Sequence, residues 1–226
     1  MGSRPKLTRQ RRMEILEAAV EMIVERGLPE TRVADVAERA GTSAALVLYY
    51  FDSKDRLLTE ALSYVEDRFY LQAFHDLTGI DSASERLAVL IARSCPPSGG
   101  DANGDWRLWF ELWTRALRDP ETARKRAALD RRWRATIADV VRDGQRSGEF
   151  ASVDADDLAL ELASLIDGLA IQVVLEDPEV GPDRMRRTCL DAAGRALERD
   201  LSAFDPAPSA RTAPRTARAH VSAAEE

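Results

Sequence analysis

The chain is organised around the stretch Arg32–Lys54, RVADVAERAGTSAALVLYYFDSK. Its apolar residues recur at the spacing of one helical face: Val33, Val36, Ala37 and Ala40. Gly41 follows at the point where a helix needs a residue tolerant of positive φ in order to end. Thr42 and Ser43 are candidate N-caps for a second short helix over residues 44–51. Two short helices joined by such a turn predict a helix-turn-helix, whose second helix enters the DNA major groove. An ordinary corner between two helices is the alternative.

The neighbouring residues extend this pattern. Residues 9–26 carry an apolar helical face, and Gly27 and Pro29 end that first helix. Three segments are in register with one another: RRMEILEAAVEMIVERG (11–27), T-x-V-x-D-V-A-E-R-A-G (31–41) and YYFDSK (49–54). Together they closely resemble the DNA-binding domain of the TetR (tetracycline-repressor-like) family of transcription factors. The resemblance covers about the first quarter of the chain.

This resemblance implies a set of DNA-contacting residues. They are Thr31, Arg32, Thr42, Ser43, Ala44, Ala45, Leu46, Leu48, Tyr49, Tyr50 and Lys54. Tyr49, Tyr50 and Lys54 lie where the family usually grips the phosphate backbone. The first turn of the second helix also offers free N–H groups to a phosphate. Ser43 either caps this helix or contacts phosphate, and its sequence position does not separate the two roles.

The positions at which the family reads bases are all apolar in this chain: Ala34, Ala44, Ala45, Leu46 and Leu48. The family often has polar or aromatic residues there. Apolar side chains cannot form bidentate hydrogen bonds with guanine or adenine, but they can pack against thymine methyl groups. Leu46 and Leu48 could instead face the core. Because the family buries the position of Val47, we expect Leu46 to be exposed. The operator sequence stays open.

Charge is unevenly distributed along the chain. The 226 residues carry a net charge of −7, yet residues 1–12 hold five basic residues and no acidic one. This pattern fits local phosphate contact better than non-specific coating of nucleic acid. Arg9, Arg11 and Arg12 are therefore candidate DNA contacts in a basic arm, of which residues 1–8 are expected to be disordered. A flexible basic tail without any role would give the same count.

The rest of the sequence predicts helices and no strands. We expect an all-α fold of roughly nine helices: a three-helix, helix-turn-helix DNA-binding domain at 9–54, then a helical effector-binding and dimerisation domain at 55–204. Residues 96–105, PPSGGDANGD, read as a loop and as the internal segment with the strongest disorder signal. Pro182 should open the last helix, which extends to about residue 204. The Pro/Ala/Ser/Arg-rich residues 205–226 are expected to be disordered.

The second domain also resembles a branch of this family. The matching segments are W-x-x-W-F-E-L-W-x-x-A-L-R-D-P (106–120), G-E-F (148–150) and L-I-D-G-L-A (165–170). In the family, the last two long helices pair with their copies in a second subunit as a four-helix bundle, and the middle helices enclose a small-molecule pocket. The resemblance therefore implies a homodimer through Leu158–Leu175 and the last helix. That segment is apolar almost all round, which burial inside the monomer would also explain.

Aromatic residues concentrate at one place in the second domain: Trp106, Trp109, Phe110 and Trp113, with Trp133 on the next helix. Residues three and four apart share a helical face, so these rings can line one wall of a pocket. Such a stripe could equally be plain core. The carboxylates of Glu111 and Asp167 favour a cationic or amphipathic organic ligand, because rings attract cations. A neutral apolar ligand would need the rings alone.

The leading hypothesis is a transcriptional repressor that binds a palindromic operator in double-stranded DNA as a dimer and is released by a small-molecule inducer. An all-α enzyme with an accessory helix-turn-helix and a ligand-blind DNA-binding protein are the alternatives. The sequence has two histidines and lacks nucleophile, phosphate-loop and metal-ligand motifs, so we expect no catalytic residue, metal or cofactor. Cys95 and Cys189 are expected to be buried or incidental thiols. No apolar run is long enough for a signal peptide or membrane span, which favours a cytoplasmic location.

Overall fold

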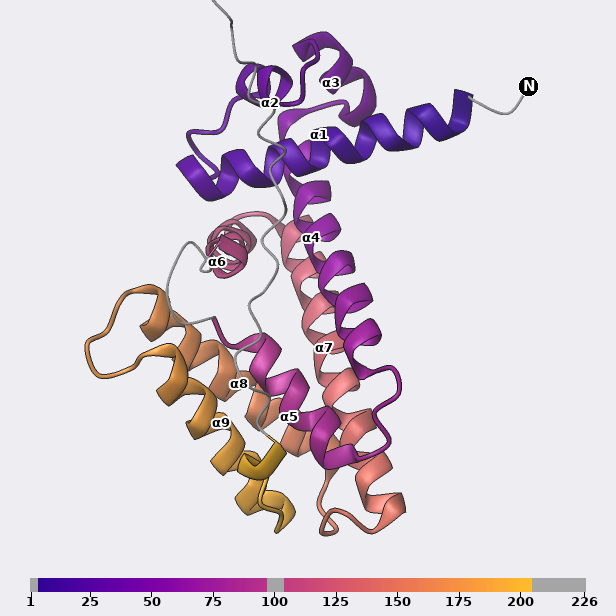
Figure 1. Ribbon diagram of the computed structural model, residues 1–226. Coiled ribbons are helices and arrows are strands. Elements are labelled where there is room, and N and C mark those ends of the chain that lie inside the picture. The colour runs from indigo at the N-terminus through magenta and orange to yellow at the C-terminus, as the bar shows by residue number, and fades with distance from the viewer. Residues whose placement is uncertain (1–3, 97–103, 205–226) are drawn as a thin grey trace, which may run out of the picture.

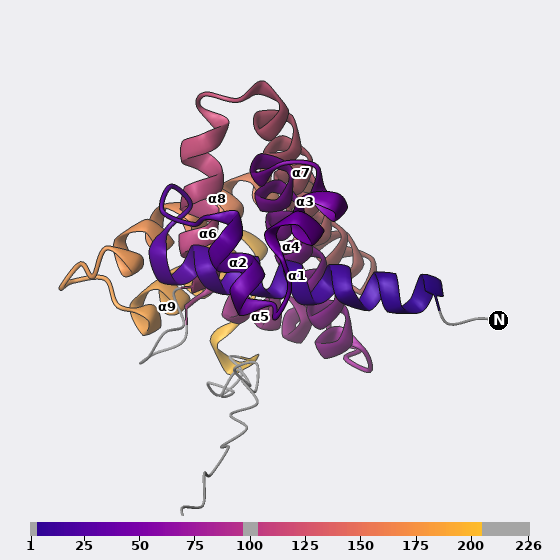
Figure 2. The ribbon, with the colours of Figure 1, turned by 90° about the horizontal axis from the view of Figure 1, so that it is seen from above.

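A computed structural model describes residues 4–96 and 104–204 of the chain. These residues form nine α-helices and no strand, so the all-α prediction is confirmed (Figure 1). Three helices make the head: α1 (Arg4–Arg26), α2 (Val33–Arg39) and α3 (Ala44–Phe51). Helix α4 (Lys54–Leu77) runs from the head into the body. The body contains α5 (Ala83–Ser94), α6 (Gly104–Ala116), α7 (Pro120–Ser147), α8 (Ala155–Val174) and α9 (Pro182–Leu197). In the view from above, α9 forms the side of the body opposite the N-terminal end of α1 (Figure 2).

The predicted helix ends are present where the sequence places caps. The Ser43 side chain accepts a hydrogen bond from the backbone N–H of Leu46, 3.2 Å away, and begins α3. Ser53 begins α4 by the same kind of bond. The Asp154 carboxylate accepts from two backbone N–H groups at the start of α8. Gly148 ends α7 in the left-handed region, at φ 76°. Local hydrogen bonding therefore fixes where these helices start and stop.

Two predicted boundaries are wrong. Residues 4–8, expected to be disordered, are the first turns of α1, because Pro5 lies in the first turn, where a missing N–H is tolerated. The last helix ends at Leu197 instead of about residue 204. Glu198 adopts φ 51°, and the N–H of Arg199 bonds to the Gly194 carbonyl at 2.9 Å, which turns the chain away. Residues 202–204 form a separate 3₁₀ turn. Residues 1–3, 97–103 and 205–226 lie outside the described residues, and with them the predicted disordered tail and most of the predicted loop 96–105. The last two residues of that loop, Gly104 and Asp105, are instead the first residues of α6.

Two hydrophobic cores form the interior. The head core combines residues of α1–α4 with Leu108 and Leu112 from α6. The body core combines residues of α5, α7, α8 and α9 with Ala73 from the far part of α4. Helices α4 and α6 therefore belong to both halves of the molecule. A change in the position of either helix in the body is transmitted directly to the packing of the head, since close-packed cores transmit strain.

The G-E-F motif joins α5 to α7. After Gly148 ends α7, the Glu149 carboxylate accepts hydrogen bonds from Ser82 and from the backbone N–H groups of Ala83 and Ser84 at the start of α5. Partial burial opposes ionisation, but these bonds outweigh it and lower the pKa of Glu149 to about 2. The Phe150 ring then fills the space beside Gly144 on α7. The motif thus fixes α5 against α7.

Candidate functional site

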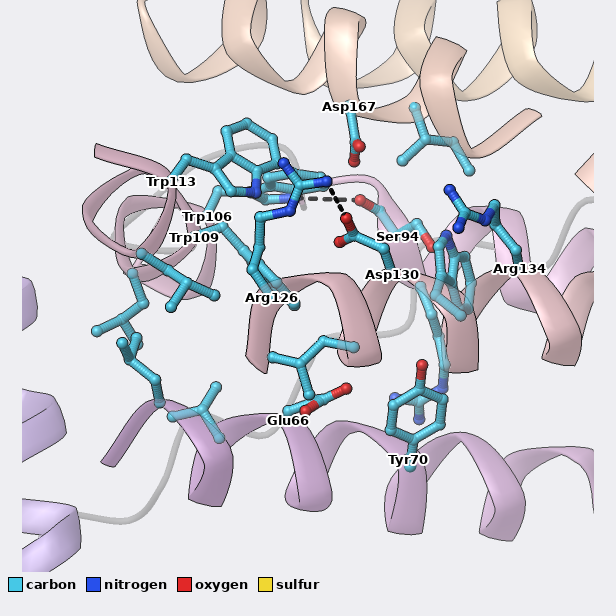
Figure 3. Close-up of a pocket in the computed structure, with 18 of the residues that line it drawn as sticks. Glu66, Tyr70, Ser94, Trp106, Trp109, Trp113, Arg126, Asp130, Arg134 and Asp167 are labelled. Atoms are coloured by element: carbon cyan, nitrogen blue, oxygen red, sulfur yellow. Dashed lines mark hydrogen bonds and ion pairs between the residues drawn. The ribbon is translucent and has the colours of Figure 1, made fainter. Parts of the chain in front are cut away.

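A cavity of about 230 Å³ lies between the head core and the body core. Helices α4, α5, α6, α7 and α8 all contribute side chains to its walls (Figure 3). Leu62 and Val65 of α4 and Leu108 and Leu112 of α6 line it and also belong to the head core. A molecule in this cavity would therefore contact the same two helices that join the body to the head.

All four tryptophans of the chain line this cavity: Trp106, Trp109, Trp113 and Trp133. The first three come from one face of α6, as their spacing predicts. Trp106 is held in place because its indole N–H donates to the Ser94 carbonyl of α5 at 3.1 Å. Phe110 does not line this cavity with them. It packs on Trp113, with ring centroids 5.5 Å apart, and faces a groove on the outside of the body.

Three carboxylic acids line the cavity. Of the two carboxylates that the sequence predicts beside the ligand, Asp167 is among them and Glu111 is not. Asp167 of α8 lines the cavity, and in Figure 3 its carboxylate projects from α8 into the site. Burial raises the pKa of Asp167 to about 6, with a further contribution from Asp130 that Arg126 and Arg134 oppose. Asp130 of α7 forms an ion pair with Arg126 of the same helix. Neither Asp167 nor the third acid, Glu66, forms an ion pair with any residue that the structure describes.

Glu66 of α4 is the residue that sequence reasoning missed. It is only 6 % exposed, and its Oε1 atom is buried without a hydrogen-bond partner among the described residues. Burial raises the pKa of Glu66 to about 7, while Arg132 lowers it and Asp67 and Asp130 raise it. The available signal was an acid on the apolar stripe of α4, four residues after Leu62.

The cation that lowers the pKa of Glu66, Arg132, is already engaged. The Arg132 guanidinium lies 3.7 Å from the centroid of the Tyr70 ring and forms a 3.1 Å ion pair with Asp67. Burial is the main cause of a raised pKa of the Tyr70 hydroxyl, which therefore stays neutral. Arg93, another cation at the cavity, pairs with Asp76 of α4. The cavity consequently combines aromatic walls with two carboxylic acids that no described residue neutralises through an ion pair.

The head presents α3 outward as predicted. Val47 is fully buried, whereas Tyr49 is 78 % exposed and Leu48 is 41 % exposed. Ala45 is exposed, and Ala44, Leu46 and Tyr50 are half-buried. The outer face of α3 is therefore apolar and aromatic, and Leu46 is partly accessible rather than enclosed in the core.

Around α3, the other predicted DNA contacts divide into accessible and engaged groups. Arg32 and Ala34 at the start of α2 are exposed, and Thr42 is half-buried in the turn. The Lys54 ammonium donates to the Pro29 carbonyl at 3.3 Å and remains partly accessible. Ser43 uses its hydroxyl as the N-cap described above.

Thr31 and two of the arm residues have structural contacts instead. The Thr31 side chain is 1 % exposed and donates to the Gly27 carbonyl at 2.7 Å, so its hydroxyl cannot contact DNA in this conformation. Arg11 donates to the Gly41 carbonyl at 2.7 Å. Arg12 donates to the Tyr50 carbonyl, pairs with Glu60 and lies over a ring of α3. These arginines join α1 to the turn after α2, to α3 and to α4. Arg9 remains exposed.

Comparison with known proteins agrees with this architecture. Residues 15–61 match the family described as "Bacterial regulatory proteins, tetR family". Residues 83–198 match "BetI-type transcriptional repressor, C-terminal", which covers about half of the chain. The chain belongs to the TetR family. It is a ligand-responsive, DNA-binding transcriptional repressor and not an enzyme. TetR-family regulators bind DNA and small-molecule effectors, typically as dimers.

Individual relatives within the TetR family match most of the chain. The regulator BetI 1 of Chromohalobacter salexigens is 28 % identical over 201 residues, which are 88 % of this chain and 96 % of that protein. A transcriptional regulator from Saccharomonospora viridis, solved in complex with choline, is 35 % identical with a TM-score of 0.76; the match covers 82 % of this chain and 96 % of that one. A TetR-family regulator from a Rhodococcus species is 29 % identical with a TM-score of 0.73, over 83 % of this chain and 98 % of that one.

Other functional features are absent from the described residues. No group of three or more His, Cys, Asp or Glu side chains is placed to hold a metal ion. No described helix has the length and apolar character that crossing a membrane requires. Cys95 and Cys189 are both buried and form no disulfide with each other, in agreement with the prediction of buried thiols.

Proposed function

We propose that this TetR-family repressor is induced by a small organic cation that binds in the cavity between head and body. The main support for this proposal is the lining of the cavity. It combines all four tryptophans with two acids that have no ion-pair partner among the described residues, Glu66 and Asp167. A cation over an aromatic ring gains about 0.5–2 kcal/mol per ring, most when it is desolvated. A buried carboxylate gains further when an opposite charge enters its surroundings. The choline complex of the Saccharomonospora viridis relative supports this ligand class.

Helix α6 provides a physical link from ligand to head. Trp106, Trp109 and Trp113 face the cavity, while Leu108 and Leu112 of the same helix pack in the head core. Arg115 near the end of α6 also pairs with Asp55 at the start of α4, at 3.1 Å. A ligand that fits one position of α6 better than another would shift the head between two orientations. Induction requires that the ligand bind the DNA-free orientation more tightly.

The proposed DNA-binding form is a cytoplasmic homodimer on a palindromic operator. Leu160 and Ile171 lie on the outer side of α8 and are 48 % and 38 % exposed, as a seam with a second copy requires. Helix α9 packs beside α8 and would complete the four-helix bundle. The two α3 helices of a dimer must then lie about 34–36 Å apart, or a multiple of this, to enter successive major grooves.

Within each head, we assign phosphate contacts to Tyr49, Tyr50 and Lys54. Arg32, Thr42 and Arg9 are proposed as further phosphate contacts at the edges of this surface. Base contacts would come from Ala44, Ala45, Leu46 and Leu48, through thymine methyl groups. Both assignments rest on exposure and on position in the helix-turn-helix. We place Ser43 in a structural role, since its hydroxyl caps α3.

The test of the ligand class compares choline with 3,3-dimethylbutan-1-ol, its uncharged analogue of the same shape. Because all four tryptophans line the cavity, intrinsic tryptophan fluorescence reports on this site. We expect choline to change the fluorescence and to release a DNA fragment that the protein selects from a random library. The alcohol should bind at least about tenfold more weakly, since it gains neither the cation–π nor the ionic contribution. Equal binding of both would assign the cavity to neutral apolar ligands.

A further inference from the structure

Glu66 is the most unusual side chain of the cavity. It is more than nine-tenths buried, and its Oε1 atom has no hydrogen-bond partner among the described residues. In Figure 3 its carboxyl group lies on the α4 side of the cavity, across from Asp167 and the tryptophans of α6. An unsatisfied buried acceptor is costly, and native structures seldom retain one without a reason.

The side chains around Glu66 do not supply the missing donor. Arg132 is held by Tyr70 and Asp67, and Arg126 is held by Asp130. Leu62, Val65 and Leu129, which line the same cavity, are apolar. A quaternary ammonium placed among the tryptophans would supply charge but no hydrogen, because its nitrogen carries no N–H. The proposed donor is therefore another part of the ligand.

We propose that Glu66 is a specificity-determining residue that accepts a hydrogen bond from a hydroxyl or N–H group carried by the cationic effector beyond its ammonium centre. This inference rests on the proposed function. The bound effector would span the cavity, with its cation at the tryptophans of α6 and its donor at α4. It would thus contact both helices that join body and head.

The protonation state of Glu66 is consistent with an acceptor in the complex. Burial raises the pKa of the free side chain to about 7. A cation bound in the same cavity favours the ionised form, so the occupied site presents a carboxylate. Hydrogen bonds to a carboxylate are about twice as strong as neutral ones, which gives the donor a large effect on selection.

The experiment measures binding by tryptophan fluorescence for three ligands that share a trimethylammonium group. Choline carries a hydroxyl, its 2-amino analogue carries N–H groups, and its O-methyl ether carries no donor. For the wild-type protein we expect choline, the amino analogue or both to bind at least about tenfold more tightly than the ether. In Glu66→Met, which keeps the length of the side chain but removes the acceptor, this preference should fall to about twofold or less.

Two further variants make the result specific. Ser164→Ala is the matched control, because the Ser164 hydroxyl lines the cavity but already donates to the Leu160 carbonyl at 2.8 Å; it should keep the wild-type preference. If Glu66→Met does not fold, Glu66→Gln retains a weaker neutral acceptor and should show an intermediate preference.

The outcomes separate this inference from the proposed function. If the wild type binds all three ligands without preference, or if the preference survives in Glu66→Met, the role of Glu66 is wrong. Either result leaves the cation site intact. If the wild type binds none of the three ligands and does not bind tetramethylammonium, both the role of Glu66 and the proposed cation site are wrong.

Discussion

Asp167→Asn should weaken binding of an organic cation and change its dependence on pH. The variant keeps the size of the side chain and removes only its charge. Asp167 is half-buried in the cavity lining, where Arg126 and Arg134 oppose the rise of its pKa, and Arg126 also pairs with Asp130. A bound cation would bring Asp167 a neutralising charge in addition to those of Arg126 and Arg134.

The magnitude follows from Coulomb's law and the pKa. A cation about 5 Å from a carboxylate, at an effective dielectric constant of about 20, gains roughly 3 kcal/mol at most. Relaxation and the neighbouring arginines reduce this gain, so we expect the variant to bind about 10- to 100-fold more weakly at pH 8. The pKa of free Asp167 is raised to about 6, and the cation binds its ionised form. The contribution of Asp167 to the wild-type affinity should therefore rise as the pH passes through about 6 and then level off.

Glu66 adds a second rise near pH 7, where its own raised pKa lies. In Asp167→Asn the lower step should disappear while the upper step remains. The assay is a tryptophan fluorescence titration with tetramethylammonium between pH 5 and 8. The matched control is Asp191→Asn, which removes a charge from the exposed side of α9, far from the cavity lining. Identical affinity profiles for wild type and Asp167→Asn would refute the assignment of Asp167 to the cation site.

Three other predictions concern DNA binding, stability and assembly. Lys54→Ala should weaken binding about equally on all DNA sequences and lower the salt slope by about 0.9; loss on selected sequences only would contradict a phosphate contact. Gly144→Ala should destabilise the fold by about 1–3 kcal/mol in urea unfolding, because the added Cβ would lie 2.1 Å from the Phe150 ring. Gly168→Ala, with nothing within 4 Å, serves as the control and should not destabilise. Ile171→Asp should yield monomers in sedimentation. Leu71→Asp, which changes a more exposed leucine on α4, should not.

Much of the fold could be predicted because the signals are local. Ser43, Ser53 and Asp154 begin their helices by bonds to N–H groups two or three residues away, and such bonds can be read from sequence spacing. The tryptophan wall was predictable for the same reason, since three of its rings belong to one face of α6. The end of α9 was missed because Glu198, not a glycine, takes the left-handed conformation.

The missed features depend on contacts between distant helices. Whether Glu66 faces a cavity depends on how α4 packs against α6, α7 and α8, and helical periodicity does not specify that packing. Arg12 looked like a free basic residue, but its partners Tyr50 and Glu60 lie 38 and 48 residues further along the chain. Thr31 looked accessible beside the helix-turn-helix, yet its hydroxyl closes the turn after α1. Each of these residues has an ordinary sequence context and a tertiary role.

In the proposed mechanism, occupation of the cavity by effector and binding of DNA by the head oppose each other. The most direct measurement is the affinity of choline, from tryptophan fluorescence, with and without a saturating concentration of the selected operator fragment. Linkage requires that operator weaken choline binding by the same factor by which choline weakens operator binding. We predict equal factors of about 5- to 150-fold, the usual range for allosteric coupling. A choline affinity that is unchanged by operator would contradict the account.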